Sequence, residues 1–183
     1  MELNEKTLRR ETVYEGVLLH VVKDDVKLPD GSKSTREMIL HPGAAAVIPF
    51  TSDNRLLLVK QFRKPLERVL YEIPAGKIDA TDNNPLETIK RELEEETGYQ
   101  ASDWSFYRTS ALAVGYSSEL IHLYIAKNLY KVEDAKEKDV DEFIEVVAVT
   151  YDELKQLEAD GELLDSKTQM ALDYWTNIQL NRK

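Results

Sequence analysis

The sequence predicts a mixed α/β protein, in which a small N-terminal antiparallel β domain precedes a larger α/β domain. Residues 8–40 alternate between apolar and polar side chains, as strands do, whereas the later part of the chain combines strand-like and helical patterns. Between them, the residues "HPGA" at 41–44 interrupt the alternation. We therefore place a β domain over residues 1–42 and a second domain over residues 43–183.

The composition narrows the class of protein. The chain has 183 residues, 42% hydrophobic and 32% charged, which suits a folded core. A net charge of −10 disfavours general binding to nucleic acid or to anionic membranes. The chain has no Cys, which excludes disulfides and thiolate metal sites. Neither a signal-peptide pattern nor an apolar run near the ~18 residues of a membrane span is present, so a cytoplasmic location is expected.

Strand signals dominate the first 77 residues. The turn residues 29–31, Pro-Asp-Gly, divide residues 8–40 into about three antiparallel strands. The apolar run "AAAVIPF" predicts a strand that is buried on both faces. It forms a predicted hairpin with "RLLLVKQFR" across residues 52–54, Ser-Asp-Asn, and "VLYEIPAGK" predicts a short strand that enters a glycine loop.

The best-defined helix runs from about Pro85 to Thr97. Asn84 is a favourable N-cap, and Pro85 suits the first helical position. Glu87 is placed to complete a capping box, and Gly98 provides the C-terminal stop. One face of this helix carries the apolar residues Leu86, Ile89 and Leu93.

The remaining pattern completes the second domain. Strands are predicted near residues 105–110, 119–126 and 143–149. Two further helices are predicted near residues 151–159 and 165–181.

Four glutamates crowd the end of the predicted helix. On a helical wheel, Glu96 falls about 60° from Leu93, Glu92 about 100° and Glu95 about 160°, while Glu94 points away. Partly buried carboxylates repel one another unless a cation lies between them. Oxygen ligands without Cys or a nearby His favour Mg²⁺ or Mn²⁺ over Zn²⁺. The alternative interpretation is a solvated charged helix face, which is the commoner meaning of such a run taken alone.

A longer pattern favours the metal site. The segment "GKIDATDNNPLETIKRELEEETGY" at residues 76–99 resembles the Nudix box, a glycine loop followed by a glutamate-rich helix. The flanking segments "REMILHPGAAAV", "VKQFR", "YEIPAGK", "SSE" and "GELLDSKT" are similar to the ADP-ribose pyrophosphatase branch of the Nudix hydrolases. The box positions that match are Gly76, Arg91, Glu92, Leu93, Glu95, Glu96, Gly98 and Tyr99.

The resemblance implies a Nudix-type α/β/α sandwich with a mixed sheet, beside the small N-terminal antiparallel β domain. It implies Mg²⁺-dependent hydrolysis of the diphosphate of ADP-ribose or a related nucleotide sugar, giving a nucleoside monophosphate and a sugar phosphate. Glu92 and Glu96 would be the main metal ligands, with Glu95 close by and the Ala75 carbonyl completing the shell. Arg91 would orient the glutamates rather than touch the substrate.

The resemblance also implies residues outside the box. Arg36 and Arg63 match substrate contacts of the family, and a surface salt bridge is the alternative for each. Glu119 matches a glutamate near the second phosphate. Glu142 matches a catalytic loop glutamate that reaches the metal, with a solvated acidic loop as the alternative. A homodimer is expected, in which Arg36 acts across the interface.

The sequence departs from the family pattern at three places. The first glutamate of the box is either replaced by Asp82 or lost within "DNN", and there is one additional residue between Gly76 and Arg91. Residues 113–116, Ala-Val-Gly-Tyr, replace a proline-containing motif that is typical of the branch. Val140 occupies a position where many members carry an acidic base, for which Glu137, Asp139 or Asp141 could substitute.

Two functional alternatives therefore stay open beside ADP-ribose hydrolysis. One is hydrolysis of a GDP-sugar or another nucleoside diphosphate derivative. The other is a module that binds a nucleotide sugar without cleaving it, for which Val140 and the altered loop are the support. The intact Glu92, Glu95 and Glu96 favour an enzyme.

Overall fold

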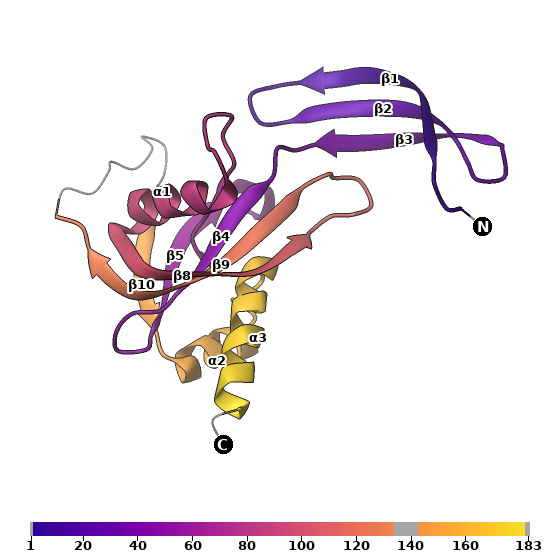
Figure 1. The fold of residues 1–183 in the computed structure, drawn as a ribbon. Helices are drawn as coiled ribbons and strands as arrows, with labels where there is room; N and C mark the ends of the chain where they lie inside the picture. Colours follow the sequence, from indigo (N-terminus) through magenta and orange to yellow (C-terminus); the bar gives the residue numbers. More distant parts are fainter. Residues whose placement is uncertain (1, 134–142, 182–183) are drawn as a thin grey trace. The chain divides into compact units, whose positions relative to one another are not determined.

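The computed structural model describes residues 2–133 and 143–181 (Figure 1). The chain forms two compact units, which are described separately below. The first unit contains residues 1–43 together with 110–121, and the second contains residues 44–109 together with 122–183. The first unit thus includes a segment that the sequence prediction placed in the second domain.

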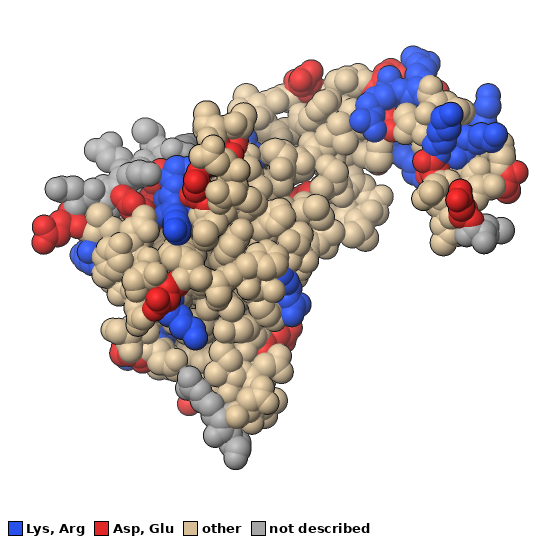
Figure 2. Space-filling view, in the orientation of Figure 1, with Lys and Arg blue, Asp and Glu red and all other residues tan. Residues whose placement is uncertain are grey.

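The first unit contains the expected three-stranded antiparallel sheet. Its strands are β1 (Lys6–Glu15), β2 (His20–Lys27) and β3 (Lys33–Leu40), in the order β1-β2-β3. The predicted turn joins β2 to β3, where Gly31 has a φ of 88° that favours glycine. In Figure 2, Lys and Arg side chains gather over this sheet, with carboxylates between them.

An ion pair with one buried partner joins β1 to β2 in this sheet. Asp24 on β2 is buried, and the paired residue Arg10 on β1 donates two hydrogen bonds of 2.7 Å to its carboxylate. These bonds from Arg10 lower the pKa of Asp24 below its usual range, against the opposing effect of burial. The edge residue Ile39 accepts a hydrogen bond from Ser118 N–H at 3.0 Å, which joins β3 to residues 110–121.

In the second unit, the described residues form two sheets and three α-helices. One sheet has the order β7-β4-β9-β8 and the other the order β10-β5-β6. The helices are α1 (Pro85–Thr97), α2 (Tyr151–Ala159) and α3 (Ser166–Leu180), with a short 3₁₀ turn at Lys64–Leu66. The strands are β4 (Ala44–Pro49), β5 (Leu56–Arg63), β6 (Arg68–Glu72), β7 (Ala75–Lys77), β8 (Tyr99–Ala111), β9 (Leu120–Lys131) and β10 (Glu145–Val149).

Helices cover both faces of the four-stranded sheet, which confirms the predicted sandwich class. Ile89 and Leu93 of α1 are fully buried in an apolar cluster against which Trp104 of β8 packs. Tyr107 lies three residues further along β8, so its side chain points to the opposite face. There its ring contacts Tyr174 of α3, with the ring centroids 5.0 Å apart. The sheet therefore separates α1 from α3 (Figure 1).

The predicted hairpin between residues 44–50 and 55–63 is wrong beyond its turn. Thr51 N–H donates to the carbonyl of Arg55 at 2.9 Å, and one isolated bridge joins Phe50 to Leu56. After this bridge, β4 pairs with β7 and β9, whereas β5 pairs with β6 and β10. β4 is buried along its whole length. Its partner strands β7 and β9 lie far from it in the sequence, so the local pattern does not identify them.

The other predicted elements are present with shifted ends. The strands predicted at 105–110 and 119–126 are longer, as β8 and β9, and that at 143–149 begins at Glu145. The two C-terminal helices match, and their N-caps are Thr150 and Asp165. Across the described ranges, no helix is both long and apolar enough to span a membrane.

Candidate active site

Caps at both ends fix the glutamate helix α1. The Asn84 side chain accepts hydrogen bonds from the N–H groups of Leu86 and Glu87, at 3.0 and 3.1 Å. Gly98 ends the helix in a left-handed conformation, with φ 74°. The expected capping box is wrong in its second half. Glu87 accepts from Asn83, at 2.8 Å from the side-chain nitrogen and 3.4 Å from the backbone N–H, rather than from the Asn84 N–H.

The glutamates of α1 become more exposed in the order that the helical wheel predicts. Glu96 is 4% exposed, and the side chains of Glu92 and Glu95 are 17% and 24% exposed. Glu94 lies away from them and accepts a hydrogen bond of 2.7 Å from the Gln100 side chain. Three carboxylates therefore share the border between the core and the solvent.

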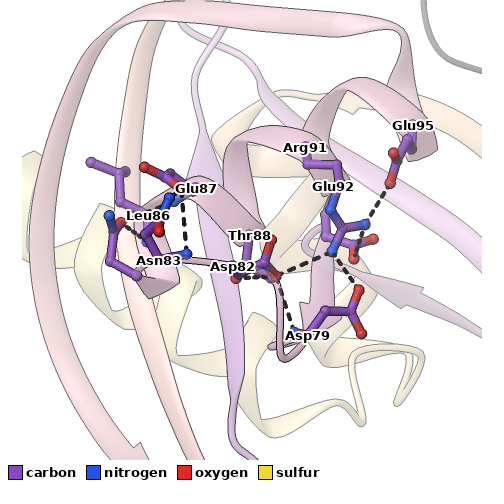
Figure 3. Close-up of polar contacts among 10 residues, drawn as sticks. Asp79, Asp82, Asn83, Leu86, Glu87, Thr88, Arg91, Glu92 and Glu95 are labelled. Carbon is purple, nitrogen blue, oxygen red and sulfur yellow. Dashed lines mark hydrogen bonds and ion pairs between the residues drawn. The ribbon is translucent and has the colours of Figure 1, made fainter.

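Arg91 binds two of these glutamates and the preceding loop together (Figure 3). Its Nη1 lies 2.9 Å from Glu92 Oε1 and 2.8 Å from Glu95 Oε2. Its Nη2 lies 3.3 Å from Asp79 and 3.5 Å from Asp82. Burial alone would lower the pKa of Arg91, but the negative charges of Glu92, Glu95 and Asp82 raise it above its ordinary value. This arrangement supports the orienting role expected of Arg91.

The backbone of β7 lies directly against the other side of the glutamates. A Cβ atom on Gly76 would lie 2.1 Å from Cδ of Glu92, so only glycine leaves room for that carboxylate. The neighbouring Ala75 N–H donates a hydrogen bond of 3.3 Å to Oε2 of Glu96. Gly76 is thus brought beside Glu92, and Ala75 beside Glu96, although they come from different elements.

Asp82 links the loop to the helix where the family pattern has its first glutamate. Its carboxylate accepts a hydrogen bond from Asp79 N–H at 3.0 Å and another from Thr88 Oγ1 at 2.9 Å. The bond from Asp79 contributes most to lowering the pKa of Asp82. With the nearby charge of Arg91, these bonds give the shorter side chain a structural role.

Arg63 is held by a buried carboxylate that the sequence analysis did not single out. Its Nε and Nη2 lie 2.6 and 2.8 Å from the two oxygens of Glu72. Lys167 Nζ lies 2.5 Å from Glu72 Oε2 and 2.9 Å from Asp165 Oδ1. Burial alone would raise the pKa of Glu72, but the Arg63 hydrogen bond and the Lys167 charge lower it to about 2. The hydrogen bond to Glu72 is the largest cause of the raised pKa of Arg63, and the negative charge of Glu96 adds to it.

The segments that contain Glu72 and Lys167 were recognisable in the sequence, but their pairing was not. Glu72 lies in "YEIPAGK" and Lys167 in "GELLDSKT", two segments that resemble the family, but neither residue was assigned a role there. A charged residue inside a strand, or at the start of a helix, is usually exposed, so neither pattern indicates a buried pair.

The other predicted site residues fall into two groups. Arg36 and Glu119 belong to the first unit. Arg36 pairs with Glu5 and donates to the Thr35 carbonyl at 2.8 Å, while Glu119 lies 3.9 Å from Nδ1 of His41. The remaining predicted residues lie outside the described residues: Glu142, Val140 and the alternative bases Glu137, Asp139 and Asp141.

The donor set suits a hard divalent cation. Carboxylates at Glu92, Glu95 and Glu96, with the peptide carbonyl of Ala75, are oxygen ligands of the kind that Mg²⁺ prefers. Within residues 2–133 and 143–181, no three Asp, Glu or His side chains already converge as a ligand group. A cation would therefore compete with Arg91 for Glu92 and Glu95.

Two family models and one solved structure match this chain. Residues 40–168 match the NUDIX domain, and residues 5–39 match the nucleoside diphosphate sugar hydrolase N-terminal domain. A solved structure titled as an ADP compounds hydrolase superposes with a TM-score of 0.83 over 98% of both chains, at 24% identity, which shows the fold.

Three relatives with different described functions are similar to this chain. The chain is 44% identical to the methanol dehydrogenase activator of Bacillus methanolicus, over 93% of this chain and 91% of that protein. It is 41% identical to the ADP-ribose pyrophosphatase of Bacillus subtilis (strain 168), over 94% and 92%. It is 34% identical to the GDP-mannose pyrophosphatase of Yersinia enterocolitica, over 76% of each. With the box residues assembled on α1 and β7, these matches show that the chain belongs to the Nudix hydrolase family.

Proposed function

We propose that this Nudix hydrolase cleaves the diphosphate of ADP-ribose or a related nucleotide sugar. The products would be a nucleoside monophosphate and a sugar phosphate. One observation carries the proposal: Arg91 pairs with Glu92 and Glu95, while the backbone of Gly76 and Ala75 lies against Glu92 and Glu96. The similarity to ADP-ribose pyrophosphatases over most of the chain supports the same substrate class.

Nudix ADP-ribose pyrophosphatases generally use a divalent metal ion. We propose Mg²⁺ here, with Mn²⁺ as the alternative, held by Glu92, Glu95, Glu96 and the Ala75 carbonyl. When bound, such a cation neutralises the diphosphate charge and activates water. The role of Arg91 is to hold Glu92 and Glu95 in place. Glu142 stays a prediction as a further metal ligand and catalytic residue, because it lies outside the described residues.

On the substrate side, Arg63 is the proposed phosphate contact of the second unit, since a guanidinium binds phosphate with a fixed geometry. Arg36 and Glu119 stay predictions for the first unit.

We also propose that residues 1–42 form a dimerisation domain, that residues 43–183 form the hydrolase domain, and that Arg36 acts on the partner subunit's site. Exposed apolar side chains on β1, at Leu8 and Val13, support a homodimer. A cytoplasmic location likewise stays a prediction.

A second substrate class has its own support. The similarity to a GDP-mannose pyrophosphatase covers about three quarters of the chain and favours a GDP-sugar as the alternative. Both substrates contain the same diphosphate, so the glutamate site would serve either one.

Product analysis tests the proposal. The protein is incubated with ADP-ribose, GDP-mannose and a dinucleotide, each with Mg²⁺ or with a chelator, and the products are separated by chromatography. AMP and ribose 5-phosphate that form only with Mg²⁺ are the expected result. Cleavage of GDP-mannose alone would move the substrate to the alternative class. Tight binding of one compound without cleavage of any would overturn the enzymatic proposal in favour of a binding module.

A further inference from the structure

The first turn of α3 contacts the site from a distant part of the sequence. Lys167 Nζ binds Glu72, and the neighbouring Thr168 Oγ1 accepts a hydrogen bond of 2.8 Å from Ile73 N–H. Glu72 and Ile73 lead through Pro74 into the Ala75–Gly76 backbone that borders the glutamates. This turn therefore fixes the strand from which that backbone continues.

Lys167 is itself firmly held. It is only 7% exposed, and its ammonium lies between Glu72 and Asp165. Asp165 is fixed in turn, because its other oxygen caps α3 by accepting from Thr168 N–H at 3.0 Å. A lysine that is fixed in this way differs from a surface lysine, whose ion pair costs side-chain entropy and contributes little.

The pair between Arg63 and Glu72 controls the direction of the guanidinium. Two parallel bonds from Nε and Nη2 align its plane with the carboxylate, and neither bond uses Nη1. The Glu72 side chain is buried, whereas the Arg63 side chain is 44% exposed, so the cation extends from a buried anchor toward the surface. Lys167 shares the Glu72 oxygen that binds Nη2, and it thereby restricts rotation of that carboxylate.

We propose that Glu72 and Lys167 are positioning residues that hold the Arg63 guanidinium with its Nη1 edge toward a phosphate of the bound nucleotide diphosphate. This inference rests on the proposed function and adds two residues that do not touch the substrate. Lys167 acts through Glu72, and Glu72 acts through Arg63.

A double-mutant cycle tests this chain of contacts. Lys167→Met should raise KM roughly tenfold, with kcat changed less than about twofold, because a misdirected Arg63 weakens binding of the diphosphate. In an Arg63→Ala background, Lys167→Met should have almost no further effect on KM, since the two changes remove the same interaction. The matched control is Lys155→Met, which removes an exposed lysine paired with Glu158 on α2 and should leave KM unchanged.

Nuclear magnetic resonance of the arginine side chains adds a measurement that needs no turnover. The Nε–H signal of Arg63, assigned by its loss in Arg63→Ala, should be distinct in the wild type. In Lys167→Met it should move to the position of solvent-exposed arginines. An unchanged signal, or equal KM effects of Lys167→Met with and without Arg63, would overturn the inference. If the wild type cleaves and binds no compound of the panel, the proposed function fails by itself, and the signal still decides whether Lys167 holds Arg63.

Glu72→Gln is the more direct change, but it leaves Lys167 buried beside a neutral group. Glu72→Gln/Lys167→Met removes both charges and should preserve the fold, which circular dichroism checks. Its KM should rise at least as much as that of Lys167→Met. A folded double variant with wild-type KM would also overturn the inference.

Discussion

At the scale of single residues, the contact between Gly76 and Glu92 links backbone shape to chemistry. The Glu92 carboxylate lies where any other residue at position 76 would place its Cβ atom. The atoms that a Cβ would meet are the end of a flexible side chain, so the helix and strand need not move. Substitution at Gly76 should therefore affect the site more than the fold.

We expect Gly76→Ala to lower kcat/KM at least about tenfold and to raise the Mg²⁺ concentration needed for half-maximal rate. The free energy of unfolding should change by less than about 1 kcal/mol, because Glu92 can swing aside. Metal titrations of the rate and urea unfolding measure the two effects. In a Glu92→Ala background, Gly76→Ala should cost little more, and a full additional loss there would contradict this contact as the cause.

Glu96 combines burial with a bond to the backbone of Ala75. Glu96→Gln keeps an oxygen for that N–H but removes the charge, so we expect the rate to fall about 100-fold or more while stability changes by less than about 1 kcal/mol. Glu94→Gln is the matched control, because Glu94 binds Gln100 on the other side of the helix. Loss of folding in Glu96→Gln, with normal specific activity of the folded fraction, would show that Glu96 has no role in the reaction.

At the scale of elements, local interactions at the N-terminal end of α1 determine where this helix begins. The Asn84 side chain accepts from two of the first free N–H groups, and Pro85 lacks the N–H that would need a partner. Both interactions are local, which explains why the helix was predicted with its correct ends.

Asn84→Ala should lower the free energy of unfolding by about 1 kcal/mol, because the first turn of α1 loses its cap. Asn84→Asp should retain the stability, since a carboxylate accepts the same bonds and its charge is favourable at a helix N-terminus. Thermal unfolding of the two variants measures the difference. Equal losses for both would show that the cap bonds do not stabilise α1.

At the scale of the whole molecule, buried carboxylates make the protein sensitive to acid. The pKa of Glu72 is about 2 in the folded protein, against about 4.5 when unpaired. A lowered pKa contributes stability that is fully present above the unfolded value and is lost as the pH falls through the folded value. The pKa of Asp24, in the first unit, is also lowered, so acid weakens both units.

We therefore expect the free energy of unfolding to fall between about pH 4.5 and pH 2, with Glu72 contributing on the order of 3 kcal/mol. Urea unfolding at a series of pH values measures this loss. In Glu72→Gln/Lys167→Met, the dependence on pH across this range should be shallower. An equally steep dependence in both proteins would assign the acid sensitivity to other carboxylates.

The sequence by itself determined the parts that depend on near neighbours. The caps of α1, the order of exposure of its glutamates and the turn before β3 all involve residues within a few positions of one another. Such interactions repeat with fixed spacing along a helix or a turn, so they can be read from the order of residues.

Only the tertiary structure decided the contacts between distant segments. It assigned β4 and β5 to different sheets, placed Gly76 beneath Glu92, and paired Arg63 with Glu72 and Lys167. Glu72 and Lys167 are far apart in the sequence, and no local pattern shows that both are buried. Their pairing follows from the packing of α3 against β6, because a buried charge is stable only where folding brings it a partner.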